Sequence, residues 1–430
     1  MNRLKNISPG RLIVLGFFLV IMIGTCLLMS PISRNDGVDV SFIDALFTST
    51  SAVCVTGLIA IDTADTFNLF GKTVVALLIQ IGGLGVTSIG VGLIILIGKN
   101  VGIKQRMLVK EALNLTSMKG IVKLIKAVLF MTISFELIGA VLSYIVFSKD
   151  YKPLDALGIS IFHSIAAFNN SGFDILGNFK NLTDYTDNVL LNLVTCGLII
   201  FGGLGFLTIK EVIEKHSFKK LSLNSKLVIT MTCILLASGT ILLKLTENIS
   251  WLTAFLYSTS ARTAGFSTAP LSQFTNAGLF TIIILMFIGA SPGSTGGGIK
   301  TTTFFVILKN LYSVATNKHC ELFKREVSKS SITKSFIIVE LALLLIIIDT
   351  FIICIIQPQY SFIQILFEVT SAFGTVGLST GITPNLTDFS KFALTITMFI
   401  GRLGPLTMAT IWTFRPTSNV HYLEEDVTIG

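Results

Sequence analysis

Four short apolar segments of this chain each end in a glycine that is followed by Leu or Phe. They are residues 51–58 (SAVCVTGL), 166–173 (AAFNNSGF), 260–266 (SARTAGF) and 371–378 (SAFGTVGL). The glycines are separated by 115, 93 and 112 residues, which is too far for a solenoid repeat and suits a larger module. Such a repeat predicts four copies of one module around a common axis.

Each module has the same three parts. An apolar run comes first, at 12–30, 122–147, 226–245 and 334–356. A shorter amphipathic stretch leads into the glycine, at 41–52, 154–168, 250–261 and 361–373. A second apolar run follows, at about 72–97, 188–209, 278–307 and 391–412. We expect repeats at 1–98, 119–216, 221–318 and 331–430.

The composition places these modules in a membrane. Only 13% of the residues are charged and the mean hydropathy is +0.79, whereas soluble domains carry about 25% charged residues. The short stretches reach only about 17–20 Å as helices, against a hydrocarbon core of roughly 30 Å. They should therefore enter and return, and non-helical backbone at that depth must be buried in protein or line water. We predict an all-α polytopic membrane protein with eight transmembrane helices and four re-entrant pore helices around one pseudo-fourfold pore.

The basic residues are distributed unevenly over the loops. By this division of the chain, 23 of the 32 lysines and arginines lie on one side of the membrane, which predicts that both termini are cytoplasmic and argues against a nucleic-acid partner. The basic loops 99–126 and 210–226 suit lipid headgroups or a docked regulatory partner. Acidic residues gather in the opposite, outer loops, where they either attract cations or are simply solvated.

The glycine endings have the chemistry of an ion filter. Rings of backbone carbonyls can replace the water around a potassium ion without a fixed charge, and glycine permits the backbone angles that such a ring needs. Thr375-Val376-Gly377 is also the tripeptide of potassium-channel filters. The half-helices would direct their partly negative C-terminal ends at the ion. The predicted filter consists of Gly57, Gly172, Gly265 and Gly377 with the preceding Val55, Thr56, Asn170, Ser171, Thr263, Ala264, Thr375 and Val376.

Small residues recur in the second apolar runs. They lie at Gly82–Gly85 (GGLG), Gly202–Gly205 (GGLG), Gly289–Pro292 (GASP) and Gly401–Gly404 (GRLG). They follow the filter glycines by 25, 30, 24 and 24 residues, and these similar distances predict inner helices that pack or bend at one depth.

The third of these runs is broken. Pro292 and five glycines between 289 and 298 cannot continue a helix. The loop at 289–303 resembles a phosphate-binding loop only out of register, so we expect no nucleotide site in this chain. It predicts either a flexible gate below the filter or a harmless interruption. The candidate gate residues are Gly289, Ser291, Pro292, Gly293, Ser294, Thr295, Gly296, Gly297, Gly298 and Arg402.

Two arginines lie inside apolar segments. Arg402 takes the place of a glycine in the fourth GGLG-like motif, and a buried arginine costs at least about 2.5 kcal/mol. It is either an electrostatic barrier beneath the filter or part of a structural salt bridge. Arg262 lies three residues before Gly265, where a cation pointing into the pore would repel cations, so we expect it to brace the filter from behind. Candidate acidic partners are Asp44, Glu136, Glu340, Asp349 and Glu368.

The repeats, with residues 54–58 (CVTGL) and 261–266 (ARTAGF), resemble those of the Trk/Ktr/HKT superfamily of potassium transporters. The whole chain is most similar to the membrane subunit of bacterial Ktr potassium uptake systems. The resemblance implies potassium uptake across the bacterial cytoplasmic membrane, with sodium as a coupled or activating ion. It also implies a homodimer with one pore per protomer, gated by loop 289–303 and by a cytosolic nucleotide-binding ring of the RCK type.

Only the fourth repeat carries Thr-Val-Gly, and none continues as Gly-Tyr-Gly. We therefore expect a preference for potassium with a less stringent filter than that of a potassium channel. An uncoupled channel for potassium and sodium remains the alternative. A membrane enzyme is not expected, because the four histidines are scattered and form no catalytic cluster with Asp or Cys.

Overall fold

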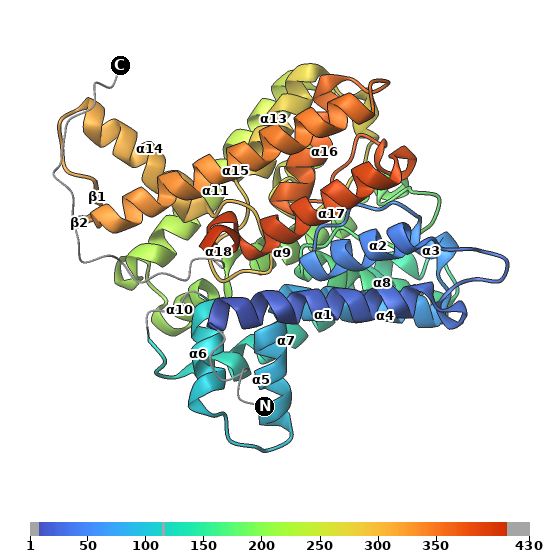
Figure 1. The fold of residues 1–430 in the computed structure, drawn as a ribbon, viewed down its shortest axis with the longest axis horizontal. Helices are drawn as coiled ribbons and strands as arrows, with labels where there is room; N and C mark the ends of the chain where they lie inside the picture. Colours follow the sequence, from blue (N-terminus) through green and yellow to red (C-terminus); the bar gives the residue numbers. More distant parts are fainter. Residues whose placement is uncertain (1–7, 114–116, 411–430) are drawn as a thin grey trace.

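The computed structural model describes residues 8–113 and 117–410, which form a mostly helical molecule (Figure 1). The expected cytoplasmic termini and the last part of the fourth repeat, 411–430, lie outside these residues. The helices are α1 (Pro9–Met29), α2 (Phe42–Cys54), α3 (Thr63–Thr66), α4 (Leu69–Leu84), α5 (Val86–Leu96), α6 (Ile103–Ala112), α7 (Ile121–Phe147), α8 (Pro153–Phe168), α9 (Val189–Leu204), α10 (Phe206–Lys215), α11 (Leu223–Thr246), α12 (Trp251–Ser260), α13 (Asn276–Phe287), α14 (Thr301–Ala315), α15 (Lys329–Ile356), α16 (Phe362–Gly374), α17 (Asp388–Leu403) and α18 (Pro405–Thr410). The strands β1 (Glu321–Leu322) and β2 (Arg325–Glu326) form a small antiparallel hairpin.

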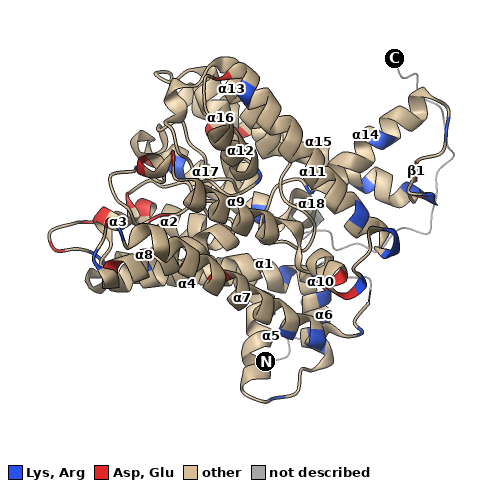
Figure 2. Ribbon diagram, turned by 180° about the vertical axis from the view of Figure 1, so that it is seen from behind, with Lys and Arg blue, Asp and Glu red and all other residues tan. Residues whose placement is uncertain are grey.

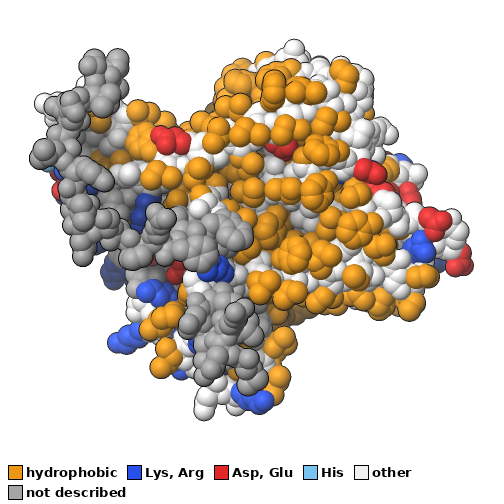
Figure 3. Space-filling view, in the orientation of Figure 1, with side chains coloured by type: hydrophobic (Ala, Val, Ile, Leu, Met, Phe, Trp, Pro, Cys, Tyr) orange, Lys and Arg blue, Asp and Glu red, His pale blue; other side chains and the backbone are white. Residues whose placement is uncertain are grey.

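Four helices, α1, α7, α11 and α15, are long enough to cross a membrane. They contain 21, 27, 24 and 28 residues, and each residue adds 1.5 Å of rise. Many of their large apolar side chains are exposed, such as Ile23 and Val141. Figure 3 shows hydrophobic side chains covering the middle of one face of the molecule. Apolar side chains on this surface match a hydrocarbon environment.

The four helices that precede the filter glycines are short. Helices α2, α8, α12 and α16 contain 13, 16, 10 and 13 residues. Serine begins three of them: the Oγ atoms of Ser41 and Ser250 each accept a backbone N–H at 3.1 Å, and the Ser361 N–H donates to Gln364 Oε1 at 3.0 Å. Such caps satisfy the free N–H groups of a helix start, and Pro153 starts the remaining helix. The last three residues of all four helices are buried.

The helices pack in a closed ring. Within each predicted repeat the long helix contacts the short one, in the pairs α1–α2, α7–α8, α11–α12 and α15–α16. The helix after each filter glycine contacts the short helix of the following repeat, in the pairs α4–α8, α9–α12, α13–α16 and α17–α2. The last of these pairs joins the fourth repeat to the first, so the four short helices surround one axis.

The second apolar runs are interrupted in all four repeats, not only in the third. The chain bends by 99° between α4 and α5 and by 95° between α9 and α10. A break also separates α17 from α18. The reason is the last glycine of each GGLG-like motif: Gly85, Gly205 and Gly404 all have φ near +90° and ψ near +133°. That conformation is outside the helical region and is open to glycine.

The first glycine of the same motif serves packing. A Cβ on Gly82 would overlap the carbonyl oxygen of Val53, at the end of the short helix α2. A Cβ on Gly202 would likewise overlap the carbonyl oxygen of Phe168, and one on Gly401 would overlap that of Phe373. The motif therefore both packs and bends the inner helices, which are the two possibilities that the sequence leaves open.

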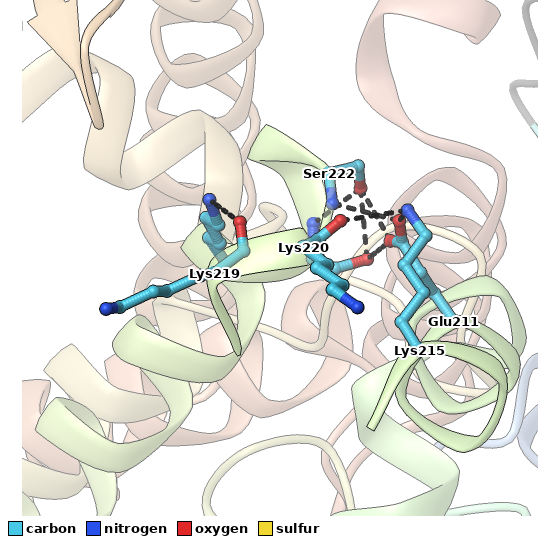
Figure 4. A network of polar contacts seen from close by, with 7 residues as sticks. Glu211, Lys215, Lys219, Lys220 and Ser222 are labelled. Carbon is cyan, nitrogen blue, oxygen red and sulfur yellow. Dashed lines mark hydrogen bonds and ion pairs between the residues drawn. The ribbon is translucent and has the colours of Figure 1, made fainter. Parts of the chain in front are cut away.

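The charged residues separate toward two ends of the molecule. Figure 2 shows Asp and Glu near α3 and most Lys and Arg around α6, α10 and α14. At the basic end, Glu211 of α10 accepts hydrogen bonds from the backbone N–H of Ser222 at 2.9 Å and from its hydroxyl at 2.7 Å (Figure 4). Glu211 also contacts Lys215 and the hydroxyl of Ser225. This network fixes the bent helix α10 to the start of α11.

Candidate ion pore

The four filter glycines meet in one closed ring. A Cβ on Gly172 would lie 2.7 Å from the carbonyl oxygen of Ala264, and one on Gly265 would lie 2.6 Å from that of Val376. A Cβ on Gly377 would overlap the carbonyl of Thr56, and one on Gly57 would overlap that of Ser171. Each glycine therefore touches the filter segment of a neighbouring repeat, and a side chain at any of the four positions would force the backbone to shift.

The filter backbone has the same unusual conformation in every repeat. The four glycines have φ between +68° and +93°. The residues two positions earlier, Val55, Asn170, Thr263 and Thr375, also have positive φ, between +50° and +75°. Left-handed conformations are strained for residues with a Cβ and cost about 1–3 kcal/mol each. In all four segments two left-handed residues are therefore separated by one other residue.

Serine hydroxyls hold this strained backbone in place. Ser51 Oγ accepts a hydrogen bond from the Gly57 N–H at 3.0 Å, and Ser371 Oγ accepts one from the Gly377 N–H at 3.1 Å. In the third repeat, Ser260 Oγ donates to the Phe266 carbonyl at 2.6 Å. Sequence reasoning assigned no role to these serines, although each is the first residue of its repeated segment. The second repeat has Ala166 at this position.

The outer end of the ring is held by a residue that the sequence did not indicate. Asn181 Nδ2 donates to the carbonyl of Gly172 and to Asp174, each at 3.1 Å, while Asn181 Oδ1 accepts from the Ser267 N–H at 3.0 Å. It thus links the second filter segment to the third. Burial raises the pKa of Asp174 to about 6, and the nearby carboxylates of Asp62 and Asp65 add to the rise. The mouth of the ring is accordingly acidic.

Arg262 is directed away from the ring. Its side chain is 6% exposed, and its Nη2 donates to the hydroxyl of Thr232 on α11 at 3.4 Å. None of the expected acidic partners forms a salt bridge with it among the described residues. The position behind the filter agrees with a bracing role, which stays a prediction.

The loop between α13 and α14 lies directly below the ring. Its base is closed by a bridge between Ile288 and Ile299. The Gly297 N–H donates to the hydroxyl of Thr375 at 3.0 Å. A Cβ on Gly296 would overlap the hydroxyl of Thr263, so this glycine also lies against the filter. The glycines of the loop therefore allow it to approach the filter residues of the third and fourth repeats.

The loop is anchored to the bends of the other inner helices. The backbone N–H groups of Ser291 and Thr295 donate to the carbonyls of Gly203 and Gly202, at 3.1 and 3.2 Å. The Gly298 N–H donates to the Gly401 carbonyl at 3.3 Å. The GGLG-like motifs of the second and fourth repeats thus provide the acceptors that hold this loop.

Three further contacts involve residues of this loop. The carbonyl of Gly293 accepts from the Phe206 N–H at 3.0 Å, next to Pro292. Ser294 Oγ donates back to the Ser291 carbonyl at 2.6 Å. A Cβ on Gly289 would overlap the carbonyl of Gly297 across the loop. The candidate gate residues therefore form one compact unit.

Two cations lie beside the loop. Arg402 donates to the carbonyls of Thr295, Gly82 and Gly83, so it joins the loop to the first repeat. No carboxylate forms a salt bridge with Arg402 among residues 8–113 and 117–410. Lys300 Nζ donates to the carbonyl of Gly296 at 2.7 Å. Lys300 is a residue that the sequence indicated only through the rejected nucleotide motif.

Arg402 and Lys300 both line a cavity of about 300 Å³. Its wall also includes Ser294 of the loop and Glu111 at the end of α6. The loop and both basic side chains therefore lie at the same cavity. Cations there repel a permeating cation unless they move or are neutralised.

A part-buried ion pair joins helices α17 and α2, where the ring of helices closes. Lys391 of α17 donates to Asp44 of α2 at 2.7 Å, and the two side chains are 8% and 18% exposed. The pair joins the fourth repeat to the first, where no peptide chain connects them. Asp44, one of the acids considered as a partner for Arg262, is therefore paired with Lys391 instead.

Comparison with known proteins supports these observations. Residues 12–420 match the profile of the family described as "TrkH: Cation transport protein". The chain belongs to the TrkH family. It is therefore a multi-pass membrane protein of a cation transport family, in agreement with the resemblance inferred from its repeats and with the expectation that it is not an enzyme.

Two relatives are similar over nearly their full length. The Ktr system potassium uptake protein B of Bacillus subtilis is 38% identical over 437 residues, covering 98% of this chain and 97% of the relative. The potassium/sodium uptake protein NtpJ of Enterococcus hirae is 37% identical over 445 residues, covering 99% and 98%.

The fold is also that of a solved structure. The crystal structure of the potassium transporter TrkH from Vibrio parahaemolyticus superposes with a TM-score of 0.71 at 19% identity. The match covers 93% of this chain and 84% of the other.

Proposed function

We propose that this protein takes up potassium across the cytoplasmic membrane through the ring formed by Gly57, Gly172, Gly265 and Gly377. The closure of this ring by four segments with one backbone conformation is the observation that carries the proposal. The names of the two relatives add potassium, alone or with sodium, as the cargo. The eight-helix division into four repeats is part of the same proposal.

The ring suits a dehydrated potassium ion for a chemical reason. Carbonyl oxygens of residues such as Thr56 and Ala264 lie at the level of the glycines, so oxygen atoms can replace the hydration shell. The short helices α2, α8, α12 and α16 end beside the ring, and their C-terminal ends carry partial negative charge. No fixed charge is required, so the ion can also leave.

The test is rubidium or potassium uptake in transport-deficient cells, with and without sodium. Native protein should restore uptake, and Gly265→Ser should lower the ratio of potassium to sodium affinity, because the added side chain meets the carbonyl of Val376. Gly197→Ala is the matched control, since a Cβ at this glycine of α9 meets no atom within 4 Å. An unchanged affinity ratio in Gly265→Ser would contradict the filter assignment.

The sodium arm separates two versions of the function. Uptake that rises with external sodium supports a coupled or sodium-activated transporter, which the name of the relative NtpJ, a potassium/sodium uptake protein, favours. Uptake that is indifferent to sodium supports the uncoupled cation channel. Both versions use the same ring.

The loop at 289–303 acts in this proposal as an intramembrane gate, closed in the present conformation. Its contacts with Thr375 and with Arg402 place it between the filter and the cavity. Deletion of 293–298 should raise rubidium flux and weaken regulation, because the obstruction and its anchors are removed. Unchanged flux at equal protein abundance would favour the alternative of a harmless interruption.

The remaining features of the proposal concern orientation and partners. The basic end around α6, α10 and α14 faces the cytoplasm, where the positive charges accumulate. A homodimer and a cytosolic nucleotide-binding ring of the RCK type follow from the resemblance to Ktr systems. Crosslinking of cysteine variants at the basic end, with and without such a subunit, tests this partner.

A further inference from the structure

Glu368 is a buried acidic residue on the short helix α16. This helix leads directly into the fourth filter segment. The residue is 1% exposed. It forms no salt bridge among the described residues, and it is none of the predicted filter or gate residues. A carboxylate held so deep without a basic partner needs other donors.

All of these donors come from the segment that follows Gly377. Glu368 Oε1 accepts hydrogen bonds from the Ser379 hydroxyl at 2.8 Å, the Thr380 N–H at 2.8 Å and the Thr380 hydroxyl at 3.1 Å. Glu368 Oε2 accepts from the Thr383 hydroxyl at 2.7 Å. The backbone N–H can only donate, and the Ser379 hydroxyl already accepts from the Gly381 N–H at 2.9 Å. Glu368 Oε1 therefore accepts three hydrogen bonds from residues 379 and 380, which tie α16 to the segment that follows Gly377.

The corresponding positions in the other repeats carry different residues. Nine residues before Gly57 and Gly172 lie Thr48 and His163, and eight residues before Gly265 lies Tyr257. The Tyr257 hydroxyl accepts from the Ala269 N–H at 3.0 Å, so it also holds the segment after its glycine. His163 instead contacts Thr195 at 2.9 Å, and the Thr48 hydroxyl has no hydrogen-bond partner within the part of the chain that the structure describes.

We propose that Glu368 is a positioning residue that fixes the outer end of the fourth filter segment and thereby sets the preference of the filter for potassium over sodium. The proposal rests on the proposed function of the ring. Its physical basis is that four hydrogen bonds to one buried carboxyl group hold residues 379–383 against α16. The segment starts only two residues after Gly377, so its position determines where the Gly377 carbonyl lies.

The experiment is rubidium uptake by the full chain in transport-deficient cells, with KM, Vmax and inhibition by sodium measured separately. Glu368→Gln replaces one acceptor oxygen by a donor nitrogen with little change of shape, and it should raise the KM for rubidium about tenfold and lower the rubidium-to-sodium ratio. Glu368→Asp keeps the charge and should fall between Gln and the native protein. Glu340→Gln, at an exposed site on α15, is the matched control and should leave KM unchanged.

Thr383→Val removes a single donor and keeps the test valid if Glu368→Gln does not reach the membrane. It should shift KM and the ion ratio in the same direction by a smaller factor. If the variants lower only Vmax, in proportion to protein abundance, Glu368 has a purely structural role and the proposal is overturned. Absence of rubidium uptake by native protein would instead overturn the proposed function itself.

Discussion

The ring of filter glycines and the breaks in the inner helices are two levels of the same four repeats. The ring keeps the fourfold pattern, whereas the breaks depart from it in the third repeat. At the ring, four segments with different residues, such as Val55-Thr56 and Asn170-Ser171, adopt one backbone conformation. At the breaks, three repeats turn at a single glycine, whereas the third inserts the loop 288–300. In the proposed function, the symmetric level selects the ion and the asymmetric level controls its passage.

Different physical causes maintain the two levels. The ring depends on backbone atoms that touch across repeat boundaries, so each glycine is fixed by its neighbours. The breaks at Gly85 and Gly404 depend on backbone conformation alone, because an added Cβ would find no close atom there. Substitutions at these glycines can therefore separate steric from conformational requirements.

The largest effect should come from Gly377→Ala. The left-handed conformation alone costs about 1–2 kcal/mol for a residue with a Cβ, and the methyl group would also overlap the carbonyl of Thr56. Rubidium uptake at low concentration should fall by at least about tenfold. Gly197→Ala at an open helical position is the control. Native affinity in Gly377→Ala would show that the ring is not the filter.

A smaller effect is expected for Arg402→Ala. This change removes the hydrogen bonds that hold Thr295 of the loop against Gly82 of the first repeat. Release of the loop should raise basal rubidium uptake about tenfold, since hydrogen bonds to charged groups contribute about 1.5–3 kcal/mol. Arg402→Lys keeps the charge but cannot bridge both carbonyls, so uptake should be intermediate.

The control for Arg402 is Lys104→Ala, which removes an exposed positive charge from α6. Its uptake should equal that of the native protein. If Arg402→Ala lowers uptake at normal protein abundance, the arginine supports the open path and does not close it.

A still smaller effect separates the two levels most directly. Gly85→Ala forces φ of +83° on a residue with a side chain, although space for the methyl group is available. We expect the free energy of unfolding in detergent to fall by about 1–3 kcal/mol, with the ratio of rubidium to sodium affinity unchanged. A changed ratio would mean that the bends also shape the filter.

The features that were predictable from the sequence are those that repeat. Each filter glycine is followed by Leu or Phe at the same place in its module. This shared position was enough to identify the four glycines of the ring from the sequence. The loop at 289–303 was predictable because Pro292 and its glycines cannot form a helix. In both cases the residue type itself, glycine or proline, determines which backbone conformations are possible.

The features that were not predictable depend on tertiary contacts between ordinary residues. Arg402 contacts the carbonyl of Gly82, which lies 320 positions away in the chain, and no side-chain pattern marks that acceptor. In the sequence Asn181 resembles any polar loop residue. Its contact with Ser267 exists only because the fold brings the two residues together. The GGLG-like motifs indicated inner helices that pack or bend, but they could not give the bend angles of 99° and 95°, which depend on the tertiary fold.

The smallest effect concerns the end of a bent helix. Glu211 accepts hydrogen bonds from Ser222, which hold α10 against the start of α11 (Figure 4). Glu211→Gln should lower the free energy of unfolding by about 1 kcal/mol and leave the KM for rubidium unchanged. Glu214→Gln is the control in the same helix, since its side chain is 55% exposed and lies 3.8 Å from Lys210. A change in KM for Glu211→Gln alone would show that the bend after Gly205 transmits to the ring, and the two levels would then be coupled.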